Sequence, residues 1–187
     1  MALATTAAVA AIPLMPPTPL PSFEAIYEEH FDFVWRTLFH LGVPRSSLDD
    51  AVQDVFVVVH RRLGDFEARS TLRTWIFGIA RRVVRDHRES TRERPAESAP
   101  EPASDESGSP FELVARAQAA RALTALLARL DDEKREAFVL AEIEELPVPE
   151  VAEALGINLN TAYARVRAAR LALERELTRL HAKERLG

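Results

Sequence analysis

Apolar residues recur at helical spacing along most of this chain of 187 residues. The first block follows Ser22, a residue type that caps helices, and the sequence GVP at 42–44 predicts where its helix ends. Its apolar positions are Phe23, Ile26, Tyr27, Val34, Trp35 and Leu38. These positions predict one amphipathic helix.

Two further helices are predicted before residue 90. One opens with SSLDD at 46–50, which resembles a helix-capping box, and the other runs from about Thr71 to Arg88. The segment VFVVVH could form a strand on its own, but its neighbours on both sides keep the helical period, so we predict a helix. The apolar stripes are Leu48, Ala51, Val52, Val55, Phe56, Val59 and Leu63 in the first helix, and Leu72, Ile76, Ile79, Ala80 and Val83 in the second.

The composition changes between Glu89 and Pro110. This segment is rich in Pro, Ser, Glu and Ala and nearly free of large apolar residues, so it cannot bury enough surface to order itself. We interpret it as a linker, acidic in its second half. The predicted fold is all-α: two small helical bundles at 22–90 and 111–182, joined by a flexible linker at 91–110 and followed by a tail at 183–187.

Residues 1–21 carry no charged side chain and include five prolines. A secretory signal needs a positively charged segment before its apolar run, and none is present here. We therefore expect a disordered N-terminal extension. The alternative that the natural chain starts at Met15 stays open.

The second bundle contains the layout of a helix-turn-helix. Helices are predicted at Phe111–Leu130 and at 131–146, the latter with an acidic first turn, and the sequence PEVAEALGINLNTAYARVRAAR follows at 149–170. Gly156 can take the left-handed conformation of a tight turn, and Asn158 can cap the helix after it. Val151, Ala152 and Leu155 would face inward from the first helix, and Leu159, Ala162, Val166, Ala169 and Leu173 from the second.

The outward face of that second helix is small and polar, as a helix that enters the major groove requires. It carries Asn160, Thr161, Ala164, Arg165 and Ala168. We expect Arg165 to read bases directly, and Asn160 and Thr161 to contact bases or phosphates. Arg167 and Arg170 flank this face and are expected to hold phosphates. Tyr163 either stacks near the backbone or packs against the bundle.

The charge distribution supports a polyanionic partner even though the net charge is −5. Residues 69–94 hold eight arginines against three acids, and residues 161–185 hold seven Lys or Arg against three acids. Local patches, rather than net charge, are typical of nucleic-acid binders. The alternative is that both stretches are merely solvated basic faces.

Other function classes find little support. Cysteine is absent, which excludes disulfides, thiolate metal sites and cysteine nucleophiles, and a cytoplasmic location is expected. No apolar run is long enough to span a membrane. The five histidines (30, 40, 60, 87 and 181) are scattered and no phosphate-binding loop is present. We expect no catalytic residues, no metal, no cofactor and no small-molecule substrate.

Two blocks of the chain resemble the bacterial sigma-70 family. Residues 48–88 resemble region 2. The residues that carry this resemblance are Asp50, Gln53, Asp54 and Phe56, followed by Trp75, Ile79, Ala80, Arg81 and Asp86. The segment from ALLARLDDEKREAFVL to the end of the helix-turn-helix resembles region 4. Because only a short linker joins these regions, the chain is most similar to the extracytoplasmic-function subfamily. The resemblance implies a sigma factor that directs promoter-specific transcription initiation, with no catalysis of its own.

The resemblance also implies partners and sites. The helix from Leu48 would dock on the β′ clamp of core RNA polymerase through Asp49, Asp50, Gln53, Asp54 and Phe56, and region 4 would meet the β flap. The periodicity agrees, since it places Asp49, Asp50, Gln53, Asp54 and His60 opposite the apolar stripe. The alternative is an ordinary solvated acidic face.

The segment after that helix would recognise and melt the minus-ten promoter element. The residues implied are Phe66, Arg69, Ser70, Thr71, Arg73, Trp75, Arg81, Arg82, Arg85 and Arg88. Opening DNA needs a platform for an unstacked base and cations for the single strand. Trp75 and Phe77 could stack on bases, although a Trp in so small a bundle is as often part of the core.

The helix-turn-helix would read the minus-thirty-five element through Asn160, Thr161, Tyr163, Ala164, Arg165, Arg167 and Arg170. Members of the family are commonly sequestered by an anti-sigma factor, often anchored in the membrane. Departures from the family pattern at Gly78, Arg82, Tyr163 and Ala164 mean that neither promoter element can be copied from a typical member.

Overall fold

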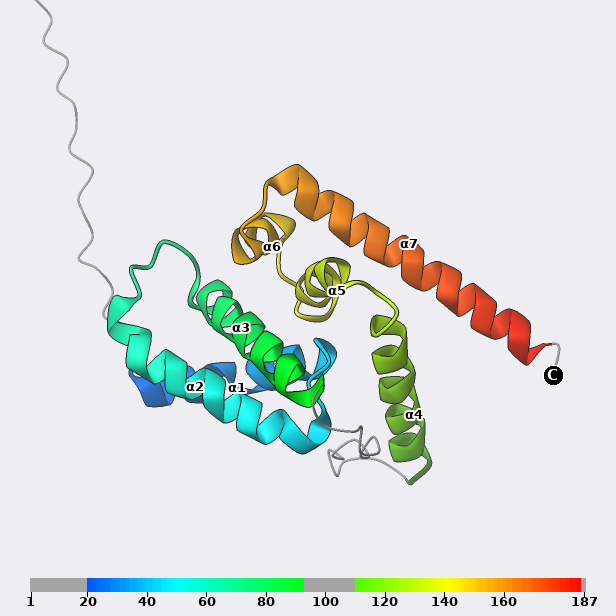
Figure 1. Cartoon of the computed structure of the whole chain (residues 1–187), viewed down its shortest axis with the longest axis horizontal. Helices are drawn as coiled ribbons and strands as arrows, with labels where there is room; N and C mark the ends of the chain where they lie inside the picture. Colours follow the sequence, from blue (N-terminus) through cyan, green and yellow to red (C-terminus); the bar gives the residue numbers. More distant parts are fainter. Residues whose placement is uncertain (1–19, 93–109, 186–187) are drawn as a thin grey trace, which may run out of the picture.

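The computed structural model describes residues 20–92 and 110–185, and in these residues every regular element is helical (Figure 1). The predicted all-α fold is therefore confirmed. The helices are α1 (Phe23–His40), α2 (Leu48–Arg62), α3 (Leu72–Arg92), α4 (Pro110–Leu127), α5 (Asp132–Phe138), α6 (Val148–Leu155) and α7 (Leu159–Glu184). Short 3-10 turns lie at Arg45–Ser47 and Leu63–Asp65, and a π-helical turn, η3, spans Val139–Ile143.

The first bundle consists of α1, α2 and α3, which all pack on one another. Ser22 caps α1 as predicted, since its hydroxyl accepts a hydrogen bond from the backbone N–H of Ala25 at 3.3 Å. Gly42, with φ at +94°, lies two residues past the last residue of α1. The capping box expected at 46–50 is wrong, because Ser47 makes no side-chain cap and a 3-10 turn leads into α2 instead.

Most positions of the predicted apolar stripes are buried in the first bundle, but Tyr27 is 40% exposed, and Phe23, Trp35, Leu63 and Leu72 are only half-buried. VFVVVH lies inside α2, so its prediction as helix is confirmed. α3 continues four residues past the predicted end at Arg88. Most of the expected linker (93–109) and of the expected N-terminal extension (1–19) lies outside the described residues, as do residues 186–187.

The second bundle is built around α7, which packs against α4, α5 and α6. Asp131 caps α5 by accepting a hydrogen bond from the backbone N–H of Lys134 at 2.9 Å, and the acidic first turn expected there is present. The single helix predicted at 131–146 is wrong in its second half. The chain there forms η3 and then an irregular segment that contains Glu145 at φ +55°.

The two bundles lie against each other. α3 packs on α6, and α1 contacts η3 (Figure 1). The buried apolar residues of both bundles belong to one contiguous cluster. Within the described part of the chain, no helix combines the length and the apolar character that crossing a membrane requires.

Candidate protein and nucleic-acid interfaces

One face of α2 is polar and exposed. Asp49, Asp50, Gln53 and Asp54 all lie on it, as the periodicity predicted. Asp49 and Asp50 occupy the first turn, where the helix dipole favours negative charge. Phe56 is different, because only 3% of it is exposed and it belongs to the core of the bundle.

An aromatic groove adjoins this polar face. It has a volume of about 600 Å³ and is lined by Phe23, Tyr27, Phe31, Asp49, Val52, Gln53, Phe56, Val57, His60 and Arg61. The rings of Tyr27 and Phe56 lie 4.6 Å apart, and Tyr27 is 40% exposed. Clustered exposed apolar side chains of this kind mark interaction sites. Phe56 is almost fully buried, and its ring forms one wall of this groove.

Sequence reasoning missed the α1 side of this groove. Phe23, Tyr27 and Phe31 follow one another at intervals of four residues, so a helix places them on one face. The apolar period places Phe23 and Tyr27 in the core stripe only. The spacing of these three aromatic residues, four positions apart, was the signal that could have indicated a surface groove.

The loop before α3 holds the first candidate minus-ten residues. Phe66 and Trp75 are both half-buried, with ring centroids 5.4 Å apart. Arg69 forms an ion pair with Glu67 of the same loop. Ala68 has φ at +52°, so the loop bends sharply beside these side chains. Phe77 is fully buried, and the suggestion that it could stack on a base is therefore wrong.

Thr71 and Ser70 fix the start of α3. The Thr71 hydroxyl oxygen accepts a hydrogen bond from the backbone N–H of Thr74 at 3.2 Å, and the Ser70 hydroxyl donates to the carbonyl oxygen of Thr71 at 3.4 Å. Thr71 thus caps α3, whereas Ser70 makes a hydrogen bond within the loop that leads into it.

The candidate cations of α3 divide into two groups. Arg82 and Arg85 are exposed, and neither has an ion-pair partner within the described parts of the chain. Arg73, Arg81 and Arg88 instead point at the second bundle. Arg73 reaches Glu144 at 3.0 Å, Arg81 reaches Glu136 at 2.8 Å, and Arg88 reaches Asp132 at 2.5 Å.

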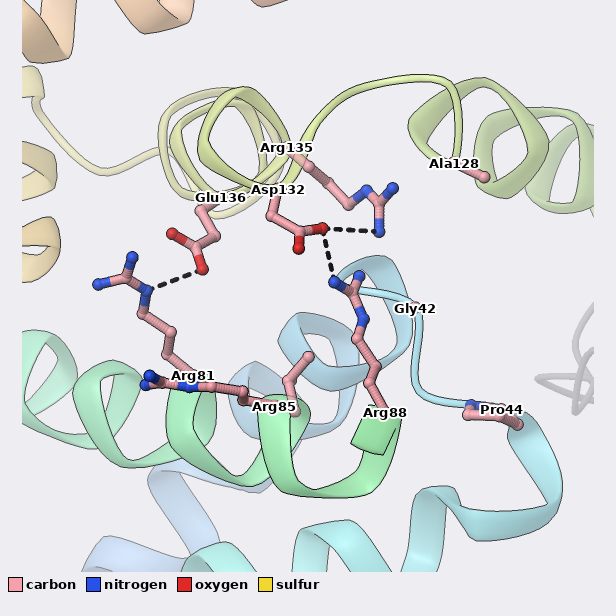
Figure 2. Close-up of a pocket in the computed structure, with 10 residues that line it drawn as sticks. Gly42, Pro44, Arg81, Arg85, Arg88, Ala128, Asp132, Arg135 and Glu136 are labelled. Atoms are coloured by element: carbon pink, nitrogen blue, oxygen red, sulfur yellow. Dashed lines mark hydrogen bonds and ion pairs between the residues drawn. The ribbon is translucent and has the colours of Figure 1, made fainter. Parts of the chain in front are cut away.

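A cavity of about 760 Å³ lies where α3 faces α5 (Figure 2). Figure 2 shows Arg81 and Arg88 extending from α3 toward Glu136 and Asp132. Arg135 enters from the α5 side, where it donates a hydrogen bond to the carbonyl oxygen of Leu41 at 3.4 Å. Burial lowers the pKa of Arg135, and the nearby Arg88 guanidinium lowers it further.

The turn of the helix-turn-helix has the predicted geometry. Gly156 has φ at +66°. Its backbone N–H donates a hydrogen bond to the carbonyl oxygen of Glu153 at 3.1 Å, and the backbone N–H of Ile157 donates to the carbonyl oxygen of Ala152 at 3.0 Å. This pair of bonds is a Schellman motif. Asn158 caps α7 by accepting a hydrogen bond from the backbone N–H of Thr161 at 2.8 Å.

The inward face of α7 is confirmed at four of its five predicted positions. Ala162, Val166, Ala169 and Leu173 are buried. Leu159 is the exception, because 44% of it is exposed, so it is a surface residue at the start of α7. It joins the outward face that includes Asn160, Tyr163, Ala164 and Arg167. The open question on Tyr163 is answered by its 54% exposure, since it does not pack into the bundle.

Arg165 and Arg170 are held by carboxylates of their own bundle. Arg165 forms an ion pair with Glu133 at 2.7 Å, which leaves 19% of its side chain exposed. The Arg170 Nε donates to a carboxylate oxygen of Glu142 at 3.0 Å. Arg167 is exposed between them. Arg165 is therefore largely covered, whereas 56% of the Arg170 side chain stays exposed beside Glu142.

Comparisons with known proteins match both bundles. Residues 26–94 match Sigma-70 region 2, and residues 120–173 match Sigma-70, region 4. RNA polymerase sigma factor CnrH of Cupriavidus metallidurans is 33% identical over 142 residues, which cover 71% of this chain and 74% of that protein. ECF RNA polymerase sigma factor SigC of Mycobacterium tuberculosis is 31% identical over 158 residues, which cover 81% of each chain.

Solved structures show the same fold. CnrH in complex with the cytosolic domain of CnrY superposes with a TM-score of 0.65 and 27% identity, over 83% of this chain and 87% of that one. The sigma factor RpoE in complex with the anti-sigma factor NepR from Bartonella quintana gives the same TM-score at 21% identity, over 83% of this chain and 96% of that one. The second likeness concerns the fold alone.

Proposed function

This chain belongs to the sigma-70 family of RNA polymerase sigma factors, and from that premise we propose how its surfaces divide the work of promoter-specific transcription initiation. The first bundle would bind core polymerase and the minus-ten element, and the second would read the minus-thirty-five element. The helix-turn-helix carries the proposal, because its Schellman turn at Gly156 and its Asn158 cap present the start of α7 to solvent.

The polymerase-binding surface is proposed to be the polar face of α2 together with the aromatic groove. Asp49, Asp50, Gln53 and Asp54 supply exposed charge and hydrogen-bonding groups, and Phe56 walls the groove beside them. Interfaces of this composition combine an aromatic anchor with a polar rim. The partner at this surface would be the β′ clamp, while the second bundle would meet the β flap.

The minus-ten surface is proposed to be the loop from Phe66 to Arg73 together with α3. A half-exposed ring pair, Phe66 and Trp75, offers a platform for an unstacked base. Ser70 and Thr71 shape this loop, and the arginines would neutralise the single strand. Those arginines are Arg69, Arg73, Arg81, Arg82, Arg85 and Arg88.

The minus-thirty-five surface is proposed to be the N-terminal half of α7. Arg165 would read a base edge once it leaves Glu133, and Asn160, Thr161, Tyr163 and Ala164 line the approach to the groove. Arg167 and Arg170 would hold phosphates. A base-reading arginine gives sequence discrimination, whereas phosphate contacts weaken with salt regardless of sequence.

We further propose that the chain acts in the cytoplasm without catalysis of its own and is held inactive by an anti-sigma factor. Among the structural relatives, RpoE was solved in complex with the anti-sigma factor NepR, and CnrH in complex with the cytosolic domain of CnrY. Among the described residues, no group of His, Asp or Glu side chains is arranged to hold a metal ion.

Binding of labelled promoter DNA with and without core polymerase tests the proposal. We expect sequence-specific binding only when core polymerase is present, and loss of that specificity in Arg165→Ala while polymerase binding is retained. Tight and specific binding by the chain alone would instead favour a regulator that works without polymerase. Retention of minus-thirty-five recognition by Arg165→Ala would refute the assignment of the base reader.

A further inference from the structure

The cavity between α3 and α5 is rich in positive charge (Figure 2). The charged side chains that line it are Arg81, Arg85, Arg88, Asp132, Arg135 and Glu136. Glu136 lies 2.8 Å from Arg81, and Asp132 lies 2.5 Å from Arg88. With four arginines against two acids, the walls carry an excess of two positive charges.

Arg88 and Arg135 bring their guanidinium groups to one point of this cavity. Both groups donate a hydrogen bond to the carbonyl oxygen of Leu41. A Cβ placed on Gly42 would lie 3.2 Å from the Arg88 Nη2 and 3.3 Å from the Arg135 Nη1, so the glycine leaves the room that both groups need. One oxygen of Asp132 lies 2.5 Å from Arg88 but 3.7 Å from Arg135. Two cations therefore share one carboxylate.

This pair of cations is incompletely neutralised. Only 11% of the Arg135 side chain is exposed. Burial lowers the pKa of Arg135, and the Arg88 guanidinium lowers it further. A charge that is removed from water is costly unless an opposite charge compensates it. An anion beside both guanidinium groups would offset their repulsion.

Arg85 extends the positive charge along α3. It is exposed, and among the described residues no carboxylate pairs with it. Arg81, Arg85 and Arg88 follow one another at intervals of four and three residues, so they share one face of the helix. Neighbouring positions on such a face lie about 5–6 Å apart at their Cβ atoms. A chain of linked phosphates can contact several of these cations at once, whereas a single phosphate cannot span the row.

We propose that this cavity binds a small molecule that carries a chain of two or more linked phosphates. Guanidinium groups bind phosphate oxygens through two parallel hydrogen bonds, which makes arginine well suited to such ligands. The volume of about 760 Å³ lies in the range of small-molecule sites. Pro44 and Ala128 line the cavity near Arg88, so a sugar or a base attached to the phosphates would find an apolar wall there (Figure 2).

Arg135 distinguishes this site from the proposed minus-ten surface. It belongs to α5, and its Nε and Nη2 donate to the carbonyl oxygens of Leu127 and Leu130 at 2.8 and 3.0 Å. These bonds hold the side chain in place and leave its Nη1 beside Gly42. The site therefore uses both bundles, and it requires neither polymerase nor DNA.

Isothermal titration calorimetry on the full chain, without polymerase or DNA, tests the site. Tripolyphosphate should bind at least about tenfold more tightly than inorganic phosphate, because several arginines act on one linked ligand. An affinity no greater than that of inorganic phosphate would overturn the proposal. ATP then identifies the source of the phosphate chain. Tighter binding of ATP than of tripolyphosphate would indicate a nucleotide that uses the apolar wall, and equal or weaker binding would indicate an inorganic polyphosphate.

Arg85→Gln is the most direct variant, because this side chain has no ion pair to lose within the described residues. It should weaken the binding of tripolyphosphate about tenfold, as expected for a hydrogen bond between charged groups. Arg129→Gln is the matched control, since Arg129 is exposed and follows Ala128 in the chain but does not line the cavity. It should leave the affinity unchanged. If both variants weaken binding equally, the ligand responds only to the overall charge and the site is wrong.

A short single strand of DNA separates this site from the proposed minus-ten surface. Binding of the strand but not of tripolyphosphate, with a loss of strand binding in Arg85→Gln, would show that the arginines of α3 serve DNA alone. That result would overturn the ligand site. Tripolyphosphate that binds the unmodified chain, and binds Arg85→Gln more weakly, would support it.

Discussion

Gly156→Ala tests the turn on which the minus-thirty-five surface depends. The left-handed conformation at φ +66° and ψ +37° costs an L-residue about 1–2 kcal/mol. An added Cβ would meet no atom within 4 Å, so a steric clash contributes nothing further. The lower conformational entropy of unfolded Ala returns about 0.4–1 kcal/mol. The free energy of unfolding should therefore fall by roughly 1 kcal/mol.

Gly78→Ala is the matched control for this substitution. Gly78 lies inside α3, and a Cβ there would also meet nothing within 4 Å. Since its backbone is helical, Ala should stabilise the chain by about 0.5–1 kcal/mol. Urea unfolding followed by circular dichroism measures both variants. A midpoint for Gly156→Ala at or above that of the unmodified chain would refute the account of the turn.

Three other outcomes are expected. Asp50→Ala combined with Gln53→Ala should weaken binding to core polymerase at least about tenfold in a titration of labelled chain, because interface residues that anchor a partner contribute this much. An unchanged affinity would show that this face does not belong to the interface. Arg167→Ala should lower the salt dependence of promoter binding by about one phosphate contact without altering sequence preference, whereas a change of preference would make it a base reader. Burial lowers the pKa of His40 below its ordinary value near 6.5, so the unfolded chain takes up the proton first as the pH falls. The stability that neutral His40 contributes is present above that ordinary pKa and is lost as the pH falls below it. Urea unfolding at pH 7.5 and 5.5 should therefore show a smaller loss of unfolding free energy in His40→Gln than in the unmodified chain. An equal loss in both would exclude His40 as a cause.

The sequence was sufficient to predict the three helices of the first bundle and the turn of the helix-turn-helix, because these depend on local spacing. Apolar periodicity located α1, α2 and α3, and Gly156 and Asn158 marked the turn through their conformational and capping preferences. The resemblance to region 2 and region 4 agreed with this pattern. The helical pattern and the resemblance together indicated the function.

The surfaces were harder to predict, because they depend on how the helices meet. Leu159 fits the apolar period but lies before the first buried turn of α7, so no partner covers it. Phe77 fits no single stripe, yet the first bundle closes over it completely. Periodicity identifies a face of a helix but not what lies against it.

The ion pairs between the two bundles could not be foreseen from spacing. Arg36 and Glu144 are 108 residues apart, and nothing in their local sequence links them. The π-helical turn before Glu144 adds a residue to the turn and shifts the phase of the helix, so the regular period misplaces the side chain that ends it. Such turns are frequent at functional sites.

Run-off transcription with core polymerase on the promoter of the chain's own gene tests the central claim most directly. The account predicts one discrete transcript that appears only when chain and core enzyme are both present, and that disappears with Arg165→Ala. The absence of any transcript under conditions where the chain binds core polymerase would contradict the claim that it is a promoter-specificity subunit.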